Sequence, residues 1–167
     1  VDLKWPNDVR IDGRKTSGIL VELASDGSGP AFAVLGIGVN LNVDPATFPD
    51  EFRDRATSLA AASGAAVDRA VFTARLFGTL ERVLDLHAQQ GFSGIRPRFE
   101  HWFRMAGRRV RVEEPGGESF VGTVIGVDGD GALRLAEAGS GERRVVAGEV
   151  TIAAEEAAPA AERGAEP

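Results

Sequence analysis

The chain has 167 residues, of which 43% are hydrophobic and 26% are charged, with a net charge of −6 and a pI of about 5.0. The apolar content is sufficient for a packed core, whereas the acidic balance argues against general affinity for nucleic-acid backbones. The sequence has no cysteine and only two histidines. This excludes a disulfide scaffold, a thiolate zinc site, a cysteine nucleophile and a three-histidine metal centre.

The length accommodates one ordinary domain, or a domain followed by a small module. No apolar run approaches the length of a membrane span and no signal-peptide pattern opens the sequence, so we expect a cytoplasmic protein without a membrane partner. The first residue is Val1, inside a stretch typical of a strand. We therefore expect ordered structure to precede it in a longer protein.

The first part of the chain is predicted to be β-structure, with strands at 1–5, 9–11, 16–23 and 31–43. Pro6-Asn7-Asp8 is typical of a turn, and Asp12-Gly13 is a strong two-residue hairpin pattern. The sequence of 31–43, AFAVLGIGVNLNV, is almost continuously apolar. That pattern indicates a strand that is buried on both faces.

Two helices are predicted after residue 67. Asp68 is a suitable N-cap for the first, and Gly91 is suited to end it. Its apolar stripe consists of Phe72, Leu76, Leu80 and Val83, with Phe77 and Leu84 beside them. The second helix covers 92–103. We expect the aromatic residues of both helices to lie in the core, namely Phe72, Phe77, Phe92, Phe99, Trp102 and Phe103.

The character of the sequence changes at residue 107. Five short strands separated by glycine-rich turns, at 109–113, 120–127, 132–136, 143–146 and 149–152, predict a small SH3-like barrel. We expect an α+β fold with one unit at 1–105, the barrel at 106–153 and a disordered tail at 154–167.

Several polar residues of the first part are candidates for chemistry. Lys4 and Lys15 are the only lysines, and a compact ammonium suits point contact with a carboxylate or phosphate. Asn7 and Asp8 are explained by turn chemistry, although an Asp beside a Lys also suits a metal–nucleotide complex. We assign no residue as a dedicated metal ligand. The two histidines are interpreted as surface or packing residues.

The glycine-rich segment Gly36–Asn40 does not match a dinucleotide fingerprint, because Leu41 takes the place of its third glycine and no helix opens there. Two interpretations remain. The glycines can permit close packing of neighbouring backbone, or they can leave a bare surface on which a ligand lies, with Asn40 offering a donor and an acceptor.

These segments together resemble the biotin protein ligases, also described as biotin–[acetyl-CoA-carboxylase] ligases. The resemblance rests on five runs in order: Lys4-Trp5-Pro6-Asn7-Asp8-Val9, Asp12-Gly13-Arg14-Lys15, Gly18-Ile19-Leu20-Val21-Glu22, Gly36-Ile37-Gly38-Val39-Asn40-Leu41-Asn42 and Arg55-Ala56-Thr57-Ser58-Leu59. It covers residues 1 to about 152. It implies the C-terminal part of a class II synthetase-like catalytic domain, followed by the family's SH3-like end domain.

The resemblance also implies a reaction. Family members join biotin to ATP, giving biotinyl-5′-AMP and pyrophosphate with Mg²⁺, and then transfer biotin to a lysine of a biotin carboxyl carrier domain. The residues that match the family's site are Lys15, which would contact biotin and the phosphoryl group; Gly18, Leu20, Gly36 and Val39, which would line the biotin pocket; and Asn7, Asp8, Asn40 and Lys4, which would lie towards the nucleotide. Asp8 is also a candidate for activating the acceptor lysine.

The family's Gly/Arg-rich loop and its helix-turn-helix are not found in this sequence. We therefore expect this chain to be inactive or nearly inactive by itself and not to bind nucleic acid. A homodimer formed through an exposed sheet edge is possible. Three alternatives remain: a lipoate- or octanoate-transferring relative, a non-catalytic small-barrel binding module, and, least favoured, a biotin-sensing repressor.

Overall fold

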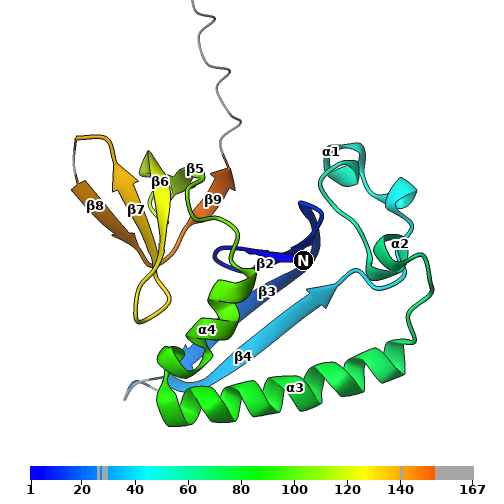
Figure 1. Cartoon of the computed structure of the whole chain (residues 1–167). Coiled ribbons are helices and arrows are strands. Elements are labelled where there is room, and N and C mark those ends of the chain that lie inside the picture. The colour runs from blue at the N-terminus through cyan, green and yellow to red at the C-terminus, as the bar shows by residue number, and fades with distance from the viewer. Residues whose placement is uncertain (26, 28–29, 140, 153–167) are drawn as a thin grey trace, which may run out of the picture.

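The computed structural model describes residues 1–25, 27, 30–139 and 141–152. These residues form two antiparallel sheets joined by helices, as Figure 1 shows, so the α+β prediction is confirmed. The predicted tail at 154–167 lies outside the described residues. No helix within the described ranges is both long and apolar enough to cross a membrane.

The first sheet is a meander with the order β1-β2-β3-β4. Its strands are β1 (Asp2–Lys4), β2 (Asp8–Ile11), β3 (Arg14–Ser25) and β4 (Pro30–Val39). Asp12 and Gly13, with φ angles of 50° and 75°, join β2 to β3. Two successive positive φ angles are the backbone requirement of the tightest hairpin turn, which explains why this dipeptide predicted it.

The prediction that 31–43 is buried on both faces is wrong. The strand ends at Val39, and Phe32 is 59% exposed, with Val34 and Leu35 also exposed. The alternation of the strand gives both of its faces apolar side chains, but among the described residues only one long helix runs beside β4 (Figure 1). A groove of about 630 Å³ separates that helix from β4.

The connection from β4 contains a short 3₁₀ turn (Pro45–Thr47) and the short helices α1 (Asp50–Arg53) and α2 (Leu59–Ser63). The long helix α3 (Arg69–Gln90) follows, and α4 (Phe92–Trp102) leads to the second sheet. The Asp68 side chain accepts a hydrogen bond from the Val71 amide, and Gly91 ends α3 with a φ of 64°. Both predicted helix ends are therefore confirmed.

The expectation that all the helix aromatics lie in the core is only partly right. Phe103 is buried, and Phe92 and Phe99 pack against the core, with ring centroids 5.8 Å apart. In contrast, Phe77 is 60% exposed, Trp102 is exposed and Phe72 lines the groove beside β4. Helical spacing places apolar residues on one face of a helix, but it does not show whether a neighbouring element covers that face.

The second sheet has the order β8-β7-β6-β5-β9. Its strands are β5 (Arg109–Glu113), β6 (Ser119–Val127), β7 (Leu133–Glu137), β8 (Gly141–Val145) and β9 (Glu149–Ile152), close to the five predicted strands. Most of the buried apolar side chains belong to this SH3-like unit, which we call the barrel. One member of its core, Trp5, comes from the turn between β1 and β2 of the first sheet.

Candidate functional site

Asp8 lies between the two lysines of the chain. Lys4 and Asp8 face each other across β1 and β2, with 3.7 Å between Lys4 Nζ and Asp8 Oδ2. The Lys15 ammonium forms an ion pair with the other carboxylate oxygen, Oδ1. The Asp8 side chain is only 13% exposed, whereas that of Lys15 is 50% exposed. One partly buried carboxylate therefore orients two cations, of which Lys15 is the more accessible to a ligand.

Gly18 provides the space in which the Lys15 side chain lies. It pairs with Asp8 across β2 and β3. A Cβ added at Gly18 would be 3.2 Å from both Cε and Nζ of Lys15, closer than ordinary van der Waals contact. The absence of a side chain at this position thus allows Lys15 to fold back towards Asp8.

The backbone of Lys15 is held by the segment that precedes α2. The Lys15 amide donates to the Arg55 carbonyl at 2.7 Å, and the Thr57 amide donates to the Lys15 carbonyl at 2.9 Å. Asn40 Nδ2 donates to the Thr57 carbonyl at 3.1 Å. Asn40, predicted to face a nucleotide, therefore ties this segment to the end of β4. Its side-chain amide contacts the backbone of Thr57, one of the two residues that bond the backbone of Lys15.

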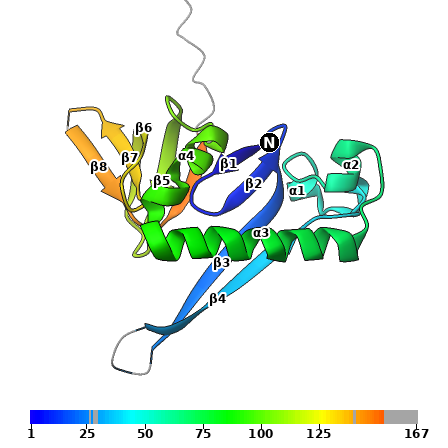
Figure 2. The ribbon, with the colours of Figure 1, turned by 60° about the horizontal axis from the view of Figure 1, so that its bottom comes forward.

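A cleft of about 470 Å³ brings Lys4, Asp8 and Lys15 together with residues far away in the sequence. Figure 2 shows the β1–β2 hairpin between the barrel and the α1–α2 segment. The other polar residues of the cleft wall are Arg10, Arg55, Glu149 and Thr151. Four cationic side chains and two carboxylates thus line one cavity, which suits a ligand with several anionic groups.

Arg10, Glu149 and Thr151 were not among the predicted site residues. Arg10 shares a face of β2 with Asp8, so the two-residue period of a strand would have been sufficient to find it. Glu149 and Thr151 belong to β9 in the barrel. Their place in the cleft depends on how the barrel docks on the first sheet, for which the sequence contains no local pattern.

The glycines of β4 leave a flat surface beside Asp8 and Gly18. Gly38 pairs with Gly18, and Gly36 pairs with Leu20. Hypothetical Cβ atoms at Gly36 and Gly38 would come no closer than 3.7 Å to any described residue. Close packing among the described residues therefore does not require these glycines, whereas a ligand lying on the sheet would use the open space. Leu20 is 60% exposed on the same face.

Two predicted site residues are placed differently. Val39 is three positions from Gly36, and it lines the groove beside α3 with Leu35 and Ile37. The structure therefore does not bring Val39 to the surface of Gly36. Asn7 lies in the turn after Trp5 and donates from Nδ2 to the Ile19 carbonyl at 2.9 Å. Its side-chain amide thereby fastens this turn to β3.

The chain is similar to known proteins in both sequence and structure. Residues 106–152 match the family described as "Biotin protein ligase C terminal domain". The bifunctional ligase/repressor BirA of Bacillus subtilis is 34% identical over 90% of this chain and 46% of its own length. The biotin–[acetyl-CoA-carboxylase] ligase of Mycobacterium tuberculosis is 39% identical over 80% of this chain and 46% of its own length. This chain is a relative of the biotin protein ligases.

Solved structures extend the relationship to the whole arrangement of sheets and helices. The apo biotin protein ligase of Aquifex aeolicus superimposes with a TM-score of 0.80 at 25% identity, covering 91% of this chain and 65% of that one. The same enzyme in complex with biotin and ATP superimposes with a TM-score of 0.76 at 27% identity, covering 91% and 61%. The chain spans about half the length of the curated biotin ligase relatives that it matches.

Proposed function

We propose that the cleft around Asp8 and Lys15 is part of the reaction centre of a biotin protein ligase. The protein would activate biotin with ATP to biotinyl-5′-AMP and transfer the biotinyl group to a lysine of a biotin carboxyl carrier domain. The observation that carries this proposal is the pairing of both lysines with Asp8 beside a bare glycine surface. It stands in a chain related to biotin ligases over nine-tenths of its length.

The first step brings two anionic groups together, because a carboxylate must approach the α-phosphate of ATP. A preorganised cation lowers this repulsion and stabilises the charge that develops on the phosphoryl oxygens. Lys15 is suited to this role, since its side chain is half exposed and its ammonium is held in place by Asp8. Lys4, on the other side of Asp8, adds a second positive charge towards the nucleotide.

The flat surface of Gly18, Gly36 and Gly38 would receive biotin next to Lys15. Leu20, exposed on that face, supplies an apolar contact for the ring system of biotin. In the transfer step, the acceptor amine must lose a proton before or as it attacks. Asp8 is the carboxylate that lies beside Lys15, so we assign the acceptance of this proton to Asp8.

Mg²⁺ would bind in the cleft together with the phosphates of ATP. No group of three or more His, Asp or Glu side chains suited to a metal occurs in the part of the chain that the structure describes. Mg²⁺ in nucleotide sites keeps several waters and uses one or two carboxylates together with phosphates. Asp8 and Glu149 are the two carboxylates of the cleft wall, so they would be the protein groups available to such an ion. The ion would neutralise phosphate charge, while Lys15 and Lys4 orient the oxygens.

The test is Lys15→Ala, with Arg96→Ala as the control because Arg96 pairs with Glu100 on α4, away from the cleft. Binding of biotin and of ATP with Mg²⁺ is measured by calorimetry. Activation is measured in a full-length protein that also supplies the family's Gly/Arg-rich loop, by biotin-dependent exchange of labelled pyrophosphate into ATP. We expect Lys15→Ala to lower the exchange rate by about 10²-fold, as loss of a preorganised charge contact does. Exchange at the wild-type rate in this variant would remove Lys15 from the reaction.

The other candidate functions predict different results. A lipoate- or octanoate-transferring relative would bind those acids in preference to biotin, which a competition assay measures directly. In a non-catalytic binding module, neither biotin nor ATP would raise the unfolding temperature, whereas a specific ligand raises it in proportion to the logarithm of its concentration. The paired lysines beside the glycine surface favour the ligase.

We propose that the partner is a carrier domain of a carboxylase and that the reaction takes place in the cytoplasm, where ATP is available. Homodimers through the edge of the first sheet would be detected by light scattering. We propose no nucleic-acid partner, because the net charge of the chain is −6.

A further inference from the structure

Trp5 connects the proposed reaction centre to the barrel. Its side chain is only 5% exposed and belongs to the same core as Met105 and Leu133. The Trp5 amide points at the Met105 sulfur at 3.1 Å, and the indole Nε1 donates to the Gly131 carbonyl at 3.0 Å. The turn that follows β1 is therefore held through its backbone by Met105, just before the barrel, and through its side chain by the barrel itself.

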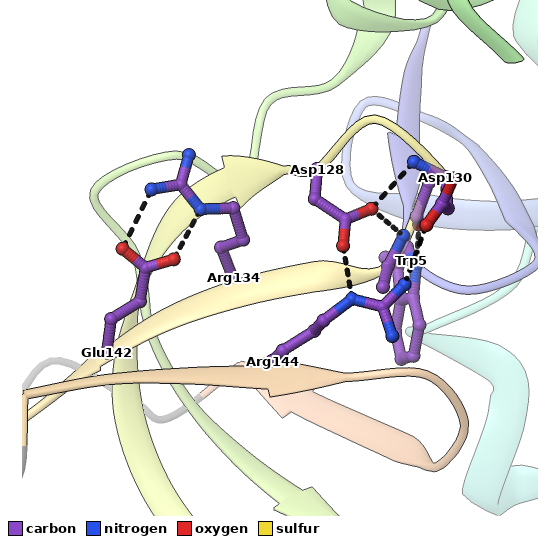
Figure 3. A network of polar contacts seen from close by, with 8 residues as sticks. Trp5, Asp128, Asp130, Arg134, Glu142 and Arg144 are labelled. Atoms are coloured by element: carbon purple, nitrogen blue, oxygen red, sulfur yellow. Dashed lines mark hydrogen bonds and ion pairs between the residues drawn. The ribbon is translucent and has the colours of Figure 1, made fainter.

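The carbonyl that receives the indole N–H belongs to the turn between β6 and β7. Asp128 organises this turn: its Oδ1 accepts from the amides of Asp130 at 2.9 Å and Ala132 at 3.0 Å. Arg144 on β8 forms an ion pair with Asp128 Oδ2 and lies 3.2 Å from Asp130 Oδ2 (Figure 3). Hydrogen bonding by Arg144 lowers the pKa of Asp128 to about 2, so the carboxylate is charged at neutral pH.

The position of Trp5 determines where two cleft residues lie. Lys4 precedes Trp5 directly, and Asp8 pairs with Lys4 at the end of the three-residue loop that Trp5 begins. A shift of the indole would therefore move the loop end of the hairpin, and with it the carboxylate that orients Lys15. The path from Asp128 to Lys15 runs through Gly131, Trp5 and Asp8.

We propose that Asp128 and Arg144 are positioning residues for the cleft: they fix the Gly131 carbonyl, which fixes Trp5 and thereby Lys4 and Asp8. The catalytic role of the cleft rests on the proposed function. The structural coupling of Asp128 and Arg144 to the cleft does not depend on that function. Neither Asp128 nor Arg144 lines the cleft. Their effect on it must therefore pass through the turn and the indole.

The barrel offers a matched control. Arg134 on β7 and Glu142 on β8 form a two-pronged ion pair, with Nε–Oε1 and Nη2–Oε2 distances of 2.5 and 2.7 Å. Figure 3 shows it beside the Asp128 network. Glu142 makes none of the bonds that hold the Gly131 turn. Asp128→Ala and Glu142→Ala thus each remove one carboxylate from an ion pair with an arginine, but only Asp128→Ala loosens the contact with Trp5.

The first readout is the indole N–H signal of Trp5 in a ¹⁵N NMR spectrum, assigned with Trp102→Phe because the chain has only two tryptophans. We expect its hydrogen exchange to become faster by about tenfold in Asp128→Ala and to stay unchanged in Glu142→Ala, since exchange reports local opening. Arg144→Gln, which leaves the Asp128 turn bonds in place, provides a milder variant whose indole signal should also shift.

The second readout is protein labelled with ¹³C-lysine, which has signals from only Lys4 and Lys15. Asp128→Ala should shift both Cε signals, and the shift should disappear in a Trp5→Phe background, where the indole donor is already absent. Lysine signals that are unmoved by Asp128→Ala, or moved equally by Glu142→Ala, would overturn the proposal. Neither spectrum requires biotin or ATP, so the proposed function can fail without affecting this result.

Discussion

Gly18→Ala tests whether the missing side chain at Gly18 is what allows the Lys15 ammonium to contact Asp8. The added Cβ would lie 3.2 Å from Lys15 Cε and Nζ, whereas ordinary contact begins at 3.4 Å. The atoms in conflict are the far end of a flexible side chain, so the ammonium should move by a few tenths of an ångström while the sheet stays in place. Gly38→Ala is the control, because its Cβ would be 3.8 Å from its nearest neighbour, the Gly18 carbonyl.

The expected effect on stability is small. Replacing glycine by alanine in a strand stabilises by about 0.5–1 kcal/mol. Weakening an ion pair whose lysine is half exposed costs about 0.2–1 kcal/mol. The two terms oppose each other, so the unfolding temperature should change by less than about 4 °C. The Lys15 Cε signal and the biotin affinity should nevertheless change in Gly18→Ala. A Lys15 signal identical to wild type, or a shift of the same size in Gly38→Ala, would refute this account of Gly18.

Three further predictions concern the fold and its charges. Asp68→Ala removes the cap of α3 and should lower the free energy of unfolding by about 1 kcal/mol in urea titrations, a loss that Asp68→Ser should largely restore. Leu135→Ala opens a cavity in the fully buried barrel core and should cost about 2–5 kcal/mol; a cost below about 1 kcal/mol would mean that the core collapses around the gap. The Asp128 pKa is lowered from 3.8 to about 2, so its ion pair contributes stability above pH 3.8 that is lost as the pH falls towards 2. Asp128→Asn should therefore be less stable than wild type at pH 5, with a difference that narrows on acidification; a difference independent of pH would contradict the pairing with Arg144.

Local patterns predicted most of the secondary structure. Asp12-Gly13, Asp68 and Gly91 each act within a few residues, through backbone φ or a single capping bond, and each occurs where predicted. The barrel strands were found for the same reason, because alternation and glycine-rich turns are short-range features. Burial was predicted less well. Phe77 and Phe32 are apolar residues on regular elements, yet no neighbouring element covers them in the described part of the chain.

The candidate site likewise contains residues that local motifs predicted and residues that only the tertiary structure brings together. A resemblance of short motifs was sufficient to single out Lys15, Gly18 and Asp8. The contacts among these residues were not visible in the sequence, because they depend on register: Asp8 faces both Lys4 and Gly18 only once three strands have paired. The Glu149 side of the cleft was missed because it depends on docking of the barrel.

The hydrogen bond from Trp5 to Gly131 spans 126 residues of sequence, which has a consequence for biosynthesis. A chain that emerges from the ribosome N-terminus first exposes the β1–β2 hairpin long before the acceptor of its indole has been translated. The contact that fixes Trp5, the residue next to Lys4, therefore cannot form until the turn before β7 has been translated. A chain that ends before Gly131 would lack the acceptor of the indole N–H, so its β1–β2 hairpin would be without this contact to the barrel.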